Sequence, residues 1–356
     1  MKKSQLEELS ISLNSTILDA IKRMDQLKRK LLIVVKDDKF YSLLSIGDIQ
    51  RAIIKGIAFD NPIEKILRTK TKIKVARTED DLNSVKEIMI RFRTEFMPVI
   101  DNNNNIVDIL FWDDVIGIKK AGFEKKIDLP VVIMAGGKGT RLKPLTNIIP
   151  KALVPLGEKP IIQMIIESFL EIGCKHFFIS VNYKKEMIRQ FFTELENQSF
   201  DVQYIEEQKP LGTAGSLYLL KGKINSTFFV SNCDVLIDQD FREVYDYHKE
   251  NNNELTIVSA LHHYEVPYGI LETKNDGLVV NLSEKPQITF QVNTGVYVLE
   301  PHLLDEIPEN KFFHITDLIA KIQNRKGRVG AFPVSEKSWI DIGKWQAYQE
   351  LFNKLG

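Results

Sequence analysis

Residues 131–160 read VVIMAGGKGTRLKPLTNIIPKALVPLGEKP, an apolar run followed by a glycine-rich and then a proline-rich stretch. The first four residues predict a buried strand, because they are apolar and end at a glycine cluster. Glycine has no side chain, so backbone N–H groups in the next turn can approach an anion closely. Arg141 and Lys151 add two positive charges beyond the strand. These features together suit the triphosphate of a nucleotide. The residues of the turn are Ala135, Gly136, Gly137, Gly139 and Thr140.

Three interpretations of this turn compete. A Walker A loop requires Gly-Lys-Ser/Thr at its end, but Lys138 is followed by Gly139. A dinucleotide fingerprint requires a helix directly after its glycines, whereas Pro144, Pro150 and Pro155 predict that the following segment stays in loops. An ordinary turn between a strand and a helix also contains glycines, and the glycines alone do not exclude it.

The whole string is more specific than its glycines. It resembles the signature of sugar-1-phosphate nucleotidyltransferases, GGxGTRLxPLT followed by PKxLxPxxxKP, and the resemblance extends from about Leu129 to the C-terminus. It implies an α/β fold with a doubly wound, Rossmann-like mixed sheet of the nucleotide-diphospho-sugar transferase type. It also implies that Arg141 and Lys151 are catalytic residues.

The composition is that of a globular protein of two domains. The chain has 356 residues, 44% of them hydrophobic, and Lys plus Arg equal Asp plus Glu at 48 each. Neither half has the basic excess of a nucleic-acid binder, and no apolar run approaches a membrane span. No secretory signal is visible, and Cys174 and Cys233 form neither a disulfide framework nor a zinc cluster. We therefore expect a protein of the reduced cytoplasm that binds neither nucleic acid nor membrane.

Residues 1–121 contain a weak internal repeat. Residues 31–49 and 96–115 each read as strand, polar turn, strand and then an Asp that opens a helix, Asp48 in one copy and Asp114 in the other. Each copy is preceded by a segment with apolar residues at helical spacing. These segments are residues 17–27 and 82–92. Repeats of this size imply two copies packed on one another.

This half resembles a pair of CBS domains, or Bateman module. In that family a Ser/Thr-x-x-Asp sequence binds the phosphate and ribose of an adenine nucleotide. Ser45 and Asp48 fit the pattern in the first copy, whereas Phe111 replaces the hydroxyl in the second. The resemblance implies at most one site for an adenine or guanine nucleotide, and a homodimer, because CBS pairs often dimerise. A purely structural or dimerising module, with Asp48 and Asp114 as helix caps, is the alternative.

We expect the CBS pair at residues 1–121, with halves at about 1–62 and 63–121, a linker at 122–128 and the nucleotidyltransferase domain at 129–356. From Leu129 on, strand and helix patterns alternate, which is typical of a doubly wound α/β sheet with ligands at the carboxyl ends of its strands. The expected strands are 176–182, 202–205 and 227–230, and the expected helices are 184–196 and 214–220.

The segment PLGTAGS at 210–216 lies between an expected strand and an expected helix. In the family this segment lines the base pocket, which implies contacts from Gly212 and Thr213. The family's base-reading position, five residues before Gly212, is here Glu207. A carboxylate only accepts hydrogen bonds, and guanine offers two adjacent donors, which favours GTP over UTP, dTTP or CTP. A solvated turn is the alternative for Glu207.

Two aspartates match the family's metal-binding positions. Asp234 follows the apolar run FFVSNC, and Asp341 lies in WIDIG. Mg²⁺ prefers one or two carboxylates together with phosphate oxygens, so the resemblance implies that this pair binds Mg²⁺ and is catalytic. The alternative is that each aspartate caps a helix or closes a turn. Cys233 stands where many relatives have Gly, and its side chain would narrow the space beside the metal.

Three further motifs match the family's sugar-binding segments, in the family's order. Lys285, in SEKP, is implied to bind the sugar phosphate as a catalytic residue. The remaining residues that the resemblance implies for the sugar are Tyr268, Gly269, Glu284, Asn293 and Thr294.

The implied reaction joins a nucleoside triphosphate to a hexose 1-phosphate and releases pyrophosphate. The attacking phosphate oxygen is already anionic at neutral pH, so no general base is needed. The domain arrangement is most similar to guanylyltransferases that act on glucosamine 1-phosphate in legionaminic acid pathways, with mannose 1-phosphate as the alternative. Two hypotheses stay open beside it: a non-catalytic regulator that binds a nucleotide sugar, and allosteric gating of the enzyme by the CBS pair.

Overall fold

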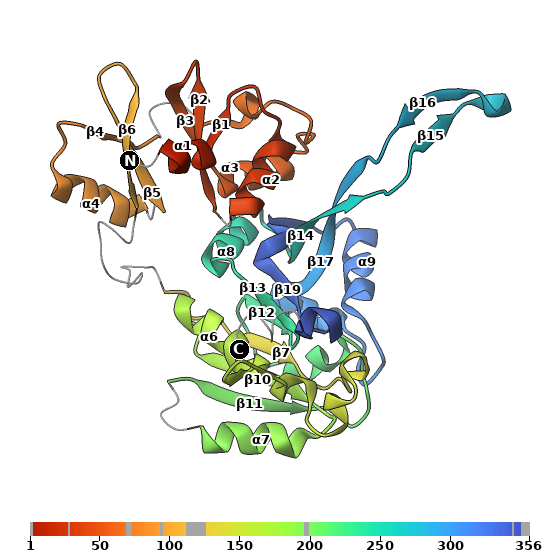
Figure 1. Cartoon of the computed structure of the whole chain (residues 1–356). Coiled ribbons are helices and arrows are strands. Elements are labelled where there is room, and N and C mark those ends of the chain that lie inside the picture. Colours follow the sequence, from red (N-terminus) through yellow and green to blue (C-terminus); the bar gives the residue numbers. More distant parts are fainter. Residues whose placement is uncertain are drawn as a thin grey trace. The chain divides into compact units, whose positions relative to one another are not determined.

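The computed structural model describes residues 3–27, 29–68, 73–92, 95–111, 126–195, 199–343 and 345–349. The chain divides into two compact units, unit 1 (Met1–Glu124) and unit 2 (Lys125–Gly356), both drawn in Figure 1. The linker expected at 122–128 falls largely outside the described residues. Within the described ranges, no helix combines the length and the apolar character needed to cross a bilayer.

Unit 1 contains the same arrangement twice. In the first copy β1 (Ser10–Ser12) runs parallel to β2 (Leu31–Lys36), which pairs antiparallel with β3 (Lys39–Ser45). In the second copy β4 (Ala76–Arg77) runs parallel to β5 (Phe96–Ile100), which pairs antiparallel with β6 (Ile106–Phe111). The helices that join the parallel pairs are α2 (Ile17–Leu27) and α4 (Leu82–Phe92), and α1 (Lys3–Leu9) and α3 (Ile46–Ile54) flank the first copy. The predicted repeat and its two preceding helices are confirmed.

The two copies share a hydrophobic core. Leu9, Leu31 and Ile33 of the first copy cluster with Phe96 and Ile109 of the second, all of them buried. The predicted packing of one copy on the other is therefore confirmed. The helix expected at Asp114 lies outside the described residues.

Unit 2 is centred on a seven-stranded mixed sheet with the order β11-β10-β7-β12-β17-β14-β18. Its strands are β7 (Val131–Met134), β10 (His176–Val181), β11 (Asp201–Glu206), β12 (Phe228–Asn232), β14 (Leu255–Glu265), β17 (Gln287–Leu299) and β18 (Val329–Val334). Strand β17 is antiparallel to both neighbours, and the other pairs are parallel. The chain runs from β7 outward through β10 to β11 and then returns to β12 on the other side of β7. Sheets of this kind bind ligands at such a reversal, beyond the strands' carboxyl ends.

Alternate residues of the strands face two separate cores. Val131 and Ile133 pack with α6 (Ile161–Ile172), α7 (Lys185–Glu194) and α8 (Phe241–Glu250). Val132 packs on the opposite face with η6 (Gly215–Leu220), η8 (Pro301–Glu306) and α9 (Ile315–Asn324), of which η6 and η8 are 3₁₀ helices. The sheet is thus covered on both faces, and the predicted α/β fold with a mixed sheet is confirmed.

Two local predictions need correction. The α-helix expected at 214–220 is the 3₁₀ helix η6, because its hydrogen bonds join residues three apart: the N–H of Leu217 donates to the carbonyl of Ala214 at 3.0 Å, and that of Lys221 to the carbonyl of Tyr218 at 3.2 Å. The proline-rich stretch after β7 is not open loop but forms short 3₁₀ turns. These turns are η3 (Thr140–Leu142), η4 (Leu145–Asn147) and η5 (Lys151–Leu153).

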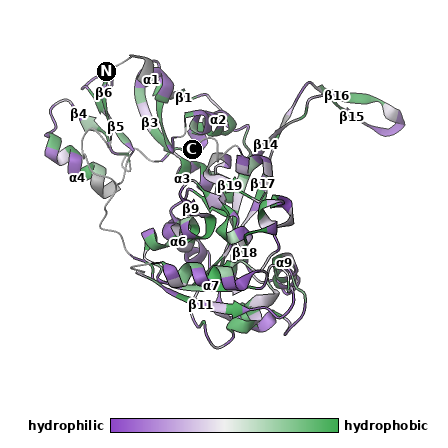
Figure 2. Ribbon diagram, turned by 60° about the horizontal axis from the view of Figure 1, so that its bottom comes forward, coloured by the Kyte–Doolittle hydropathy of each residue, from purple (hydrophilic) through white to green (hydrophobic). Residues whose placement is uncertain are grey.

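A long β-hairpin projects from the sheet of unit 2 (Figure 1). Strands β14 and β17 continue beyond the sheet and lead into β15 (Ile270–Thr273) and β16 (Val279–Ser283), which pair antiparallel. Leu271 stands opposite Leu282, and these side chains are 57% and 62% exposed. Figure 2 accordingly shows hydrophobic segments along the projecting strands.

Candidate active site

A pair of short strands brings the two candidate metal-binding aspartates together. Strand β13 (Val235–Ile237) runs antiparallel to β19 (Trp339–Asp341), with Val235 opposite Asp341. The backbone N–H of Ile342 donates to the carbonyl of Asp234 at 2.9 Å. A Cβ added to Gly343 would collide with Oδ2 of Asp234 and lie 2.8 Å from Oδ1 of Asp341. The two carboxylates therefore converge on one α-carbon, where only glycine leaves them room.

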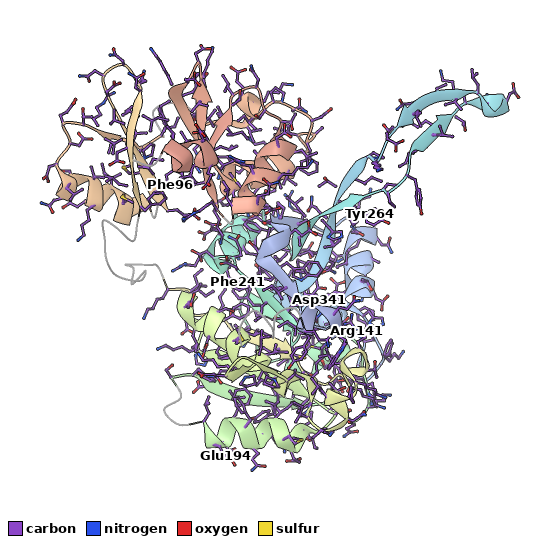
Figure 3. All side chains as sticks on the ribbon, viewed as in Figure 1. Phe96, Arg141, Glu194, Phe241, Tyr264 and Asp341 are labelled. Carbon is purple, nitrogen blue, oxygen red and sulfur yellow. The ribbon has the colours of Figure 1, made fainter. Side chains whose placement is uncertain are left out.

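Two cations converge on the same carboxylate. Lys151 forms an ion pair with Oδ2 of Asp234, and Nη2 of Arg141 lies 3.5 Å from that oxygen. The Lys151 and Asp234 side chains are nearly buried, at 12% and 8% exposed, whereas that of Arg141 is 59% exposed. Figure 3 shows Arg141 and Asp341 beside one another in unit 2. The structure thus joins four of the five residues predicted to be catalytic.

The aspartate pair fits a divalent cation. Among the described residues, the hydrogen bonds and ion pairs of the Asp234 side chain all involve Oδ2, which leaves Oδ1 for a further contact. The described part of the chain has no group of three or more His, Cys, Asp or Glu side chains that could hold a metal. A cation here would take two carboxylates and complete its shell with substrate oxygens, as Mg²⁺ prefers.

The glycine-rich turn packs against this cluster. Gly139 has φ +61°, and a Cβ there would lie 2.8 Å from Cγ2 of Thr146 and 2.9 Å from Cβ of Lys151. A Cβ on Gly137, in contrast, would meet nothing within 4 Å. Gly139 therefore lets Lys151 approach the turn, while Gly137 faces open space. Ala135 is buried at the end of β7, and Thr140 is exposed at the start of η3.

Glu207 lies on the other side of the turn, just after β11. A Cβ on Gly136 would lie 2.7 Å from its Oε1, so the carboxylate and the loop backbone are in close contact. The following segment is fixed against residues 313–315. Gly212 has φ +83° and leaves room for the carbonyl of Phe313, and the Thr213 hydroxyl accepts from the backbone N–H of Ile315 at 3.0 Å.

The structure does not bring Lys285 to the aspartate pair. Lys285 and Glu284 are exposed and lie with Tyr268 and Gly269 on the projecting hairpin, where a Cβ on Gly269 would lie 2.9 Å from Oε2 of Glu284. Figure 3 shows Tyr264, at the base of this hairpin, apart from Arg141 and Asp341. The sugar-binding and catalytic roles of the hairpin residues stay predictions.

Asn293 and Thr294 lie in β17, inside the sheet. Thr294 is 2% exposed and donates to the carbonyl of Val258 at 2.7 Å, so its side chain contributes to the packing of the sheet. The side chain of Asn293 accepts from the backbone N–H of Gly295 at 3.0 Å. Gly295 has φ +89°, and a Cβ there would collide with the Asn232 side chain at the end of β12. This part of β17 therefore borders the strand that leads to Asp234, and sugar contacts from it stay a prediction.

Ser45 and Asp48, in unit 1, engage each other and two arginines. Ser45 caps α3, its hydroxyl donates to Asp48 at 2.6 Å, and Nε of Arg68 donates to the same carboxyl group at 2.6 Å. Arg51 forms a further ion pair with it. Burial alone would raise the pKa of Asp48, but hydrogen bonds from Arg68 and Ser45 outweigh burial and hold it below its ordinary value of 3.8. The N-cap residue of α3 is thus Ser45, and Asp48 completes the capping box from the third position of the helix. Asp114 lies outside the described residues, and the nucleotide site stays a prediction.

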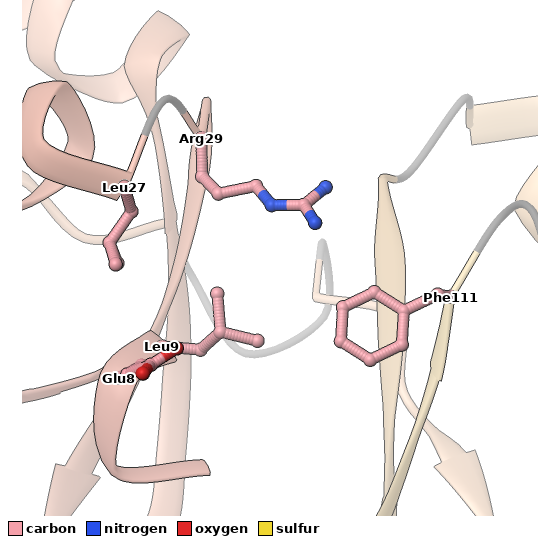
Figure 4. Close-up of a pocket in the computed structure, with 5 residues that line it drawn as sticks. All are labelled: Glu8, Leu9, Leu27, Arg29 and Phe111. Carbon is pink, nitrogen blue, oxygen red and sulfur yellow. The ribbon is translucent and has the colours of Figure 1, made fainter. Parts of the chain in front are cut away.

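A small cavity of about 150 Å³ lies elsewhere in unit 1 (Figure 4). It is lined by Glu8, Leu9, Leu27, Arg29 and Phe111. The Arg29 guanidinium lies 5.6 Å from the centroid of the Phe111 ring. Phe111, the residue that departs from the CBS pattern, therefore lines a cavity between the two copies.

Three residues of the site were not predicted. Ser180 and Asn182 hydrogen-bond to Glu207, and Gly343 makes room for the aspartate pair. The glycine stands two residues after Asp341 and was visible as part of WIDIG. No signal marked Ser180 or Asn182, because their partner follows the next strand along the chain.

Comparison with known proteins places unit 2 in a family. The sequence profile of the family described as Nucleotidyl transferase matches residues 130–356. The chain is 35% identical over 219 residues to mannose-1-phosphate guanylyltransferase catalytic subunit beta of Drosophila pseudoobscura pseudoobscura, covering 60% of this chain and 58% of that protein. It is 36% identical over 220 residues to mannose-1-phosphate guanyltransferase of Yarrowia lipolytica, covering 60% of each. The chain thus spans about three fifths of the length of these curated relatives.

Solved structures agree on the fold. HddC from Yersinia pseudotuberculosis is 28% identical, with a TM-score of 0.51, over 64% of this chain and 100% of that one. A putative glucose-1-phosphate thymidylyltransferase from Bacillus anthracis, 20% identical with a TM-score of 0.51 over 64% of this chain and 95% of that one, shares the fold. The profile match covers well over half of the chain and includes every residue of the cation–aspartate cluster. The chain therefore belongs to the nucleotidyl transferase family.

Proposed function

We propose that the chain is a sugar-1-phosphate guanylyltransferase, which transfers GMP from GTP to a hexose 1-phosphate and releases pyrophosphate. One observation carries the proposal: Arg141 and Lys151 converge on the carboxylate of Asp234, which lies close to that of Asp341, beside a glycine-rich turn at the carboxyl end of β7. A protein that only binds a nucleotide sugar would need neither metal-binding aspartate.

The chemistry requires charge control rather than a general base. A sugar phosphate oxygen attacks the α-phosphorus of GTP, the bond to the β-phosphate oxygen breaks, and pyrophosphate leaves. The obstacle is the repulsion between two polyanions. Arg141 and the amides of the glycine-rich turn neutralise the triphosphate, and Lys151 attracts the incoming phosphate. Mg²⁺, bound by Asp234 and Asp341, would supply further neutralisation of the triphosphate oxygens.

The proposed identity of the base and the proposed identity of the sugar are supported by different observations. Glu207 presents only acceptors, which suits the adjacent N–H donors of guanine, and both relatives named above are called guanylyltransferases. Their names make mannose 1-phosphate the first candidate for the sugar. Glucosamine 1-phosphate is the second candidate, because unit 1, a duplicated module, precedes the family's matched region.

The test is pyrophosphate release with Mg²⁺ across GTP, ATP, UTP, dTTP and CTP, each with mannose, glucosamine, glucose and N-acetylglucosamine 1-phosphate. We expect turnover with GTP and one of the first two sugars. Turnover confined to another triphosphate removes the guanine assignment. The absence of turnover with every combination of triphosphate and sugar phosphate refutes the proposed activity and favours a protein that only binds a nucleotide sugar.

For unit 1 we propose a CBS-like module that gates the enzyme through a nucleotide. Its two copies share topology and a common core, and one copy has the Ser45–Asp48 pattern. We expect AMP, ATP or a GDP-sugar to change kcat or KM in the wild type but not in Asp48→Ala. Unchanged kinetics of the wild type at saturating concentrations of all three ligands would reject gating.

A further inference from the structure

We propose that Ser180 is a positioning residue, which orients the Glu207 carboxylate and so sets the preference of the site for guanine. Ser180 lies in β10, next to the last residue of the strand, and is completely buried. Its hydroxyl donates to Oε1 of Glu207 at 2.5 Å. Because Ser180 is buried behind Glu207, it acts on a bound base through this carboxylate.

Hydrogen bonds also hold the second carboxylate oxygen and the backbone of Glu207. The backbone N–H of Leu211 donates to Oε2 at 3.1 Å, so each carboxylate oxygen accepts one hydrogen bond from the protein. The Glu207 backbone is also held at both ends, since its N–H donates to the carbonyl of Val181 at 3.0 Å and its carbonyl accepts from Asn182 at 2.6 Å. These contacts leave the carboxylate a single orientation.

The orientation matters because of what lies beside it. Oε1 stands 2.7 Å from the point where a Cβ on Gly136 would be, so the carboxylate contacts the turn proposed to bind the triphosphate. A base attached to that triphosphate is therefore within reach of the two acceptors. Each carboxylate oxygen has about two acceptor positions, so one remains on each oxygen after Ser180 and Leu211 have donated.

Two fixed, adjacent acceptors match two adjacent donors. In guanine these are N1–H and the 2-amino group, and hypoxanthine lacks the second. Without the Ser180 hydroxyl, Oε1 loses its anchor and Glu207 is free to rotate about its side-chain bonds. A hydrogen bond to a charged group contributes about 1.5–3 kcal/mol. We therefore expect Ser180→Ala to lower the preference for the 2-amino group by roughly tenfold or more.

The inference rests on the proposed function, and the test separates the two. Measure kcat/KM with GTP and with ITP, whose base is hypoxanthine, for the wild type, Ser180→Ala and Ser180→Cys, which preserves size but donates weakly. Ser259→Ala is the matched control, because Ser259 is also buried in the sheet and donates to a side-chain oxygen, at 2.7 Å from Gln291. We expect both Ser180 variants to lower the ratio of kcat/KM for GTP to kcat/KM for ITP. The cause should be a higher KM for GTP, with kcat near the wild-type value. Ser259→Ala should leave the ratio unchanged.

Equal use of GTP and ITP by the wild type, or an unchanged ratio in a folded Ser180 variant, overturns the inference while the guanylyltransferase stands. A wild type inactive with every triphosphate overturns the proposed function as well. If circular dichroism shows that both Ser180 variants are unfolded, the same comparison is made with Glu207→Gln. An unchanged ratio of kcat/KM for GTP to kcat/KM for ITP in that variant refutes the proposal.

Discussion

Lys151 forms an ion pair with Asp234, which stands 83 positions later in the chain, and both side chains are nearly buried. The lysine thus occupies one oxygen of a carboxylate that we propose to bind Mg²⁺. A bound metal must share this carboxylate with Lys151, so the ammonium and the metal compete for the same negative charge.

Replacing Lys151 should strengthen the effect of Mg²⁺ on stability. In Lys151→Met the Asp234 carboxylate loses its nearer cation and, among the residues that the structure describes, keeps the more distant Arg141. We therefore expect a lower Tm than in the wild type and a larger upward shift of Tm on adding Mg²⁺. Turnover should fall at least roughly tenfold, because a charge that neutralises the substrates is lost. Lys159→Met, at an exposed pair with Glu167, is the control. Equal Mg²⁺ shifts in wild type and Lys151→Met would contradict competition for Asp234.

Removing either carboxylate should abolish most of the activity. We expect Asp234→Ala and Asp341→Ala each to lower kcat by roughly 10²-fold or more, the effect of losing one electrostatic stabiliser. Asp246→Ala, on the exposed surface of α8, should leave kcat unchanged. Steady-state pyrophosphate release measures all three variants. Near-normal turnover in a folded Asp234→Ala protein would sink the assignment of the site.

The two glycines of the turn should respond differently to alanine. Gly139 has φ +61° and contacts Thr146 and Lys151, so Gly139→Ala should destabilise unit 2 by about 1–2 kcal/mol or more and displace Lys151. Gly137 has open space around its α-carbon, so Gly137→Ala should leave the free energy of unfolding within about 0.5 kcal/mol of the wild type. Thermal and urea unfolding measure both. A Gly137→Ala protein with normal stability and reduced activity would locate the triphosphate over Gly137, whereas equal destabilisation by both changes would contradict the packing described for Gly139.

The Asp48 cluster should make unit 1 sensitive to acid. The pKa of Asp48 is lower in the folded protein than its ordinary 3.8, so its carboxylate stabilises the fold above that pH. This contribution is lost as the pH falls below 3.8 through the folded value. The free-energy difference between wild type and Asp48→Asn should therefore be constant from about pH 5 to 8 and shrink below about pH 4. Urea unfolding at several pH values measures it, and a difference that grows toward low pH would have the wrong sign.

Local patterns in the sequence were sufficient for most helices and strands. The helices at Ile17–Leu27 and Leu82–Phe92 begin and end where apolar periodicity placed them, because each has one buried stripe that its own spacing defines. The strand before the glycine-rich turn was equally clear. The helix expected at 214–220 was wrong in type, since its hydrogen bonds join residues three apart rather than four, a difference that the residue types of so short a segment do not reveal.

The site itself could be predicted in its residues but not in its geometry. Asp234 and Asp341 were found by motif, yet their contact depends on the pairing of β13 with β19, which no local pattern reveals. The hydrogen bonds around Glu207 were invisible for the same reason. Lys285 was expected beside this cluster, and the structure places it on the projecting hairpin instead. The sequence thus predicts which side chains take part in the site, whereas the pairing of strands distant in the chain is known only from the structure.

The pairing of β19 with β13 also has a consequence during protein synthesis. The turn, both cations and Asp234 are synthesised well before Asp341, which β19 contributes. The second carboxylate arrives only with β19, after the sheet strands have been made. A frameshift or stop before Trp339 would therefore remove one half of the proposed metal site, Asp341, together with the buried Ile342 and Tyr348 of the hydrophobic core.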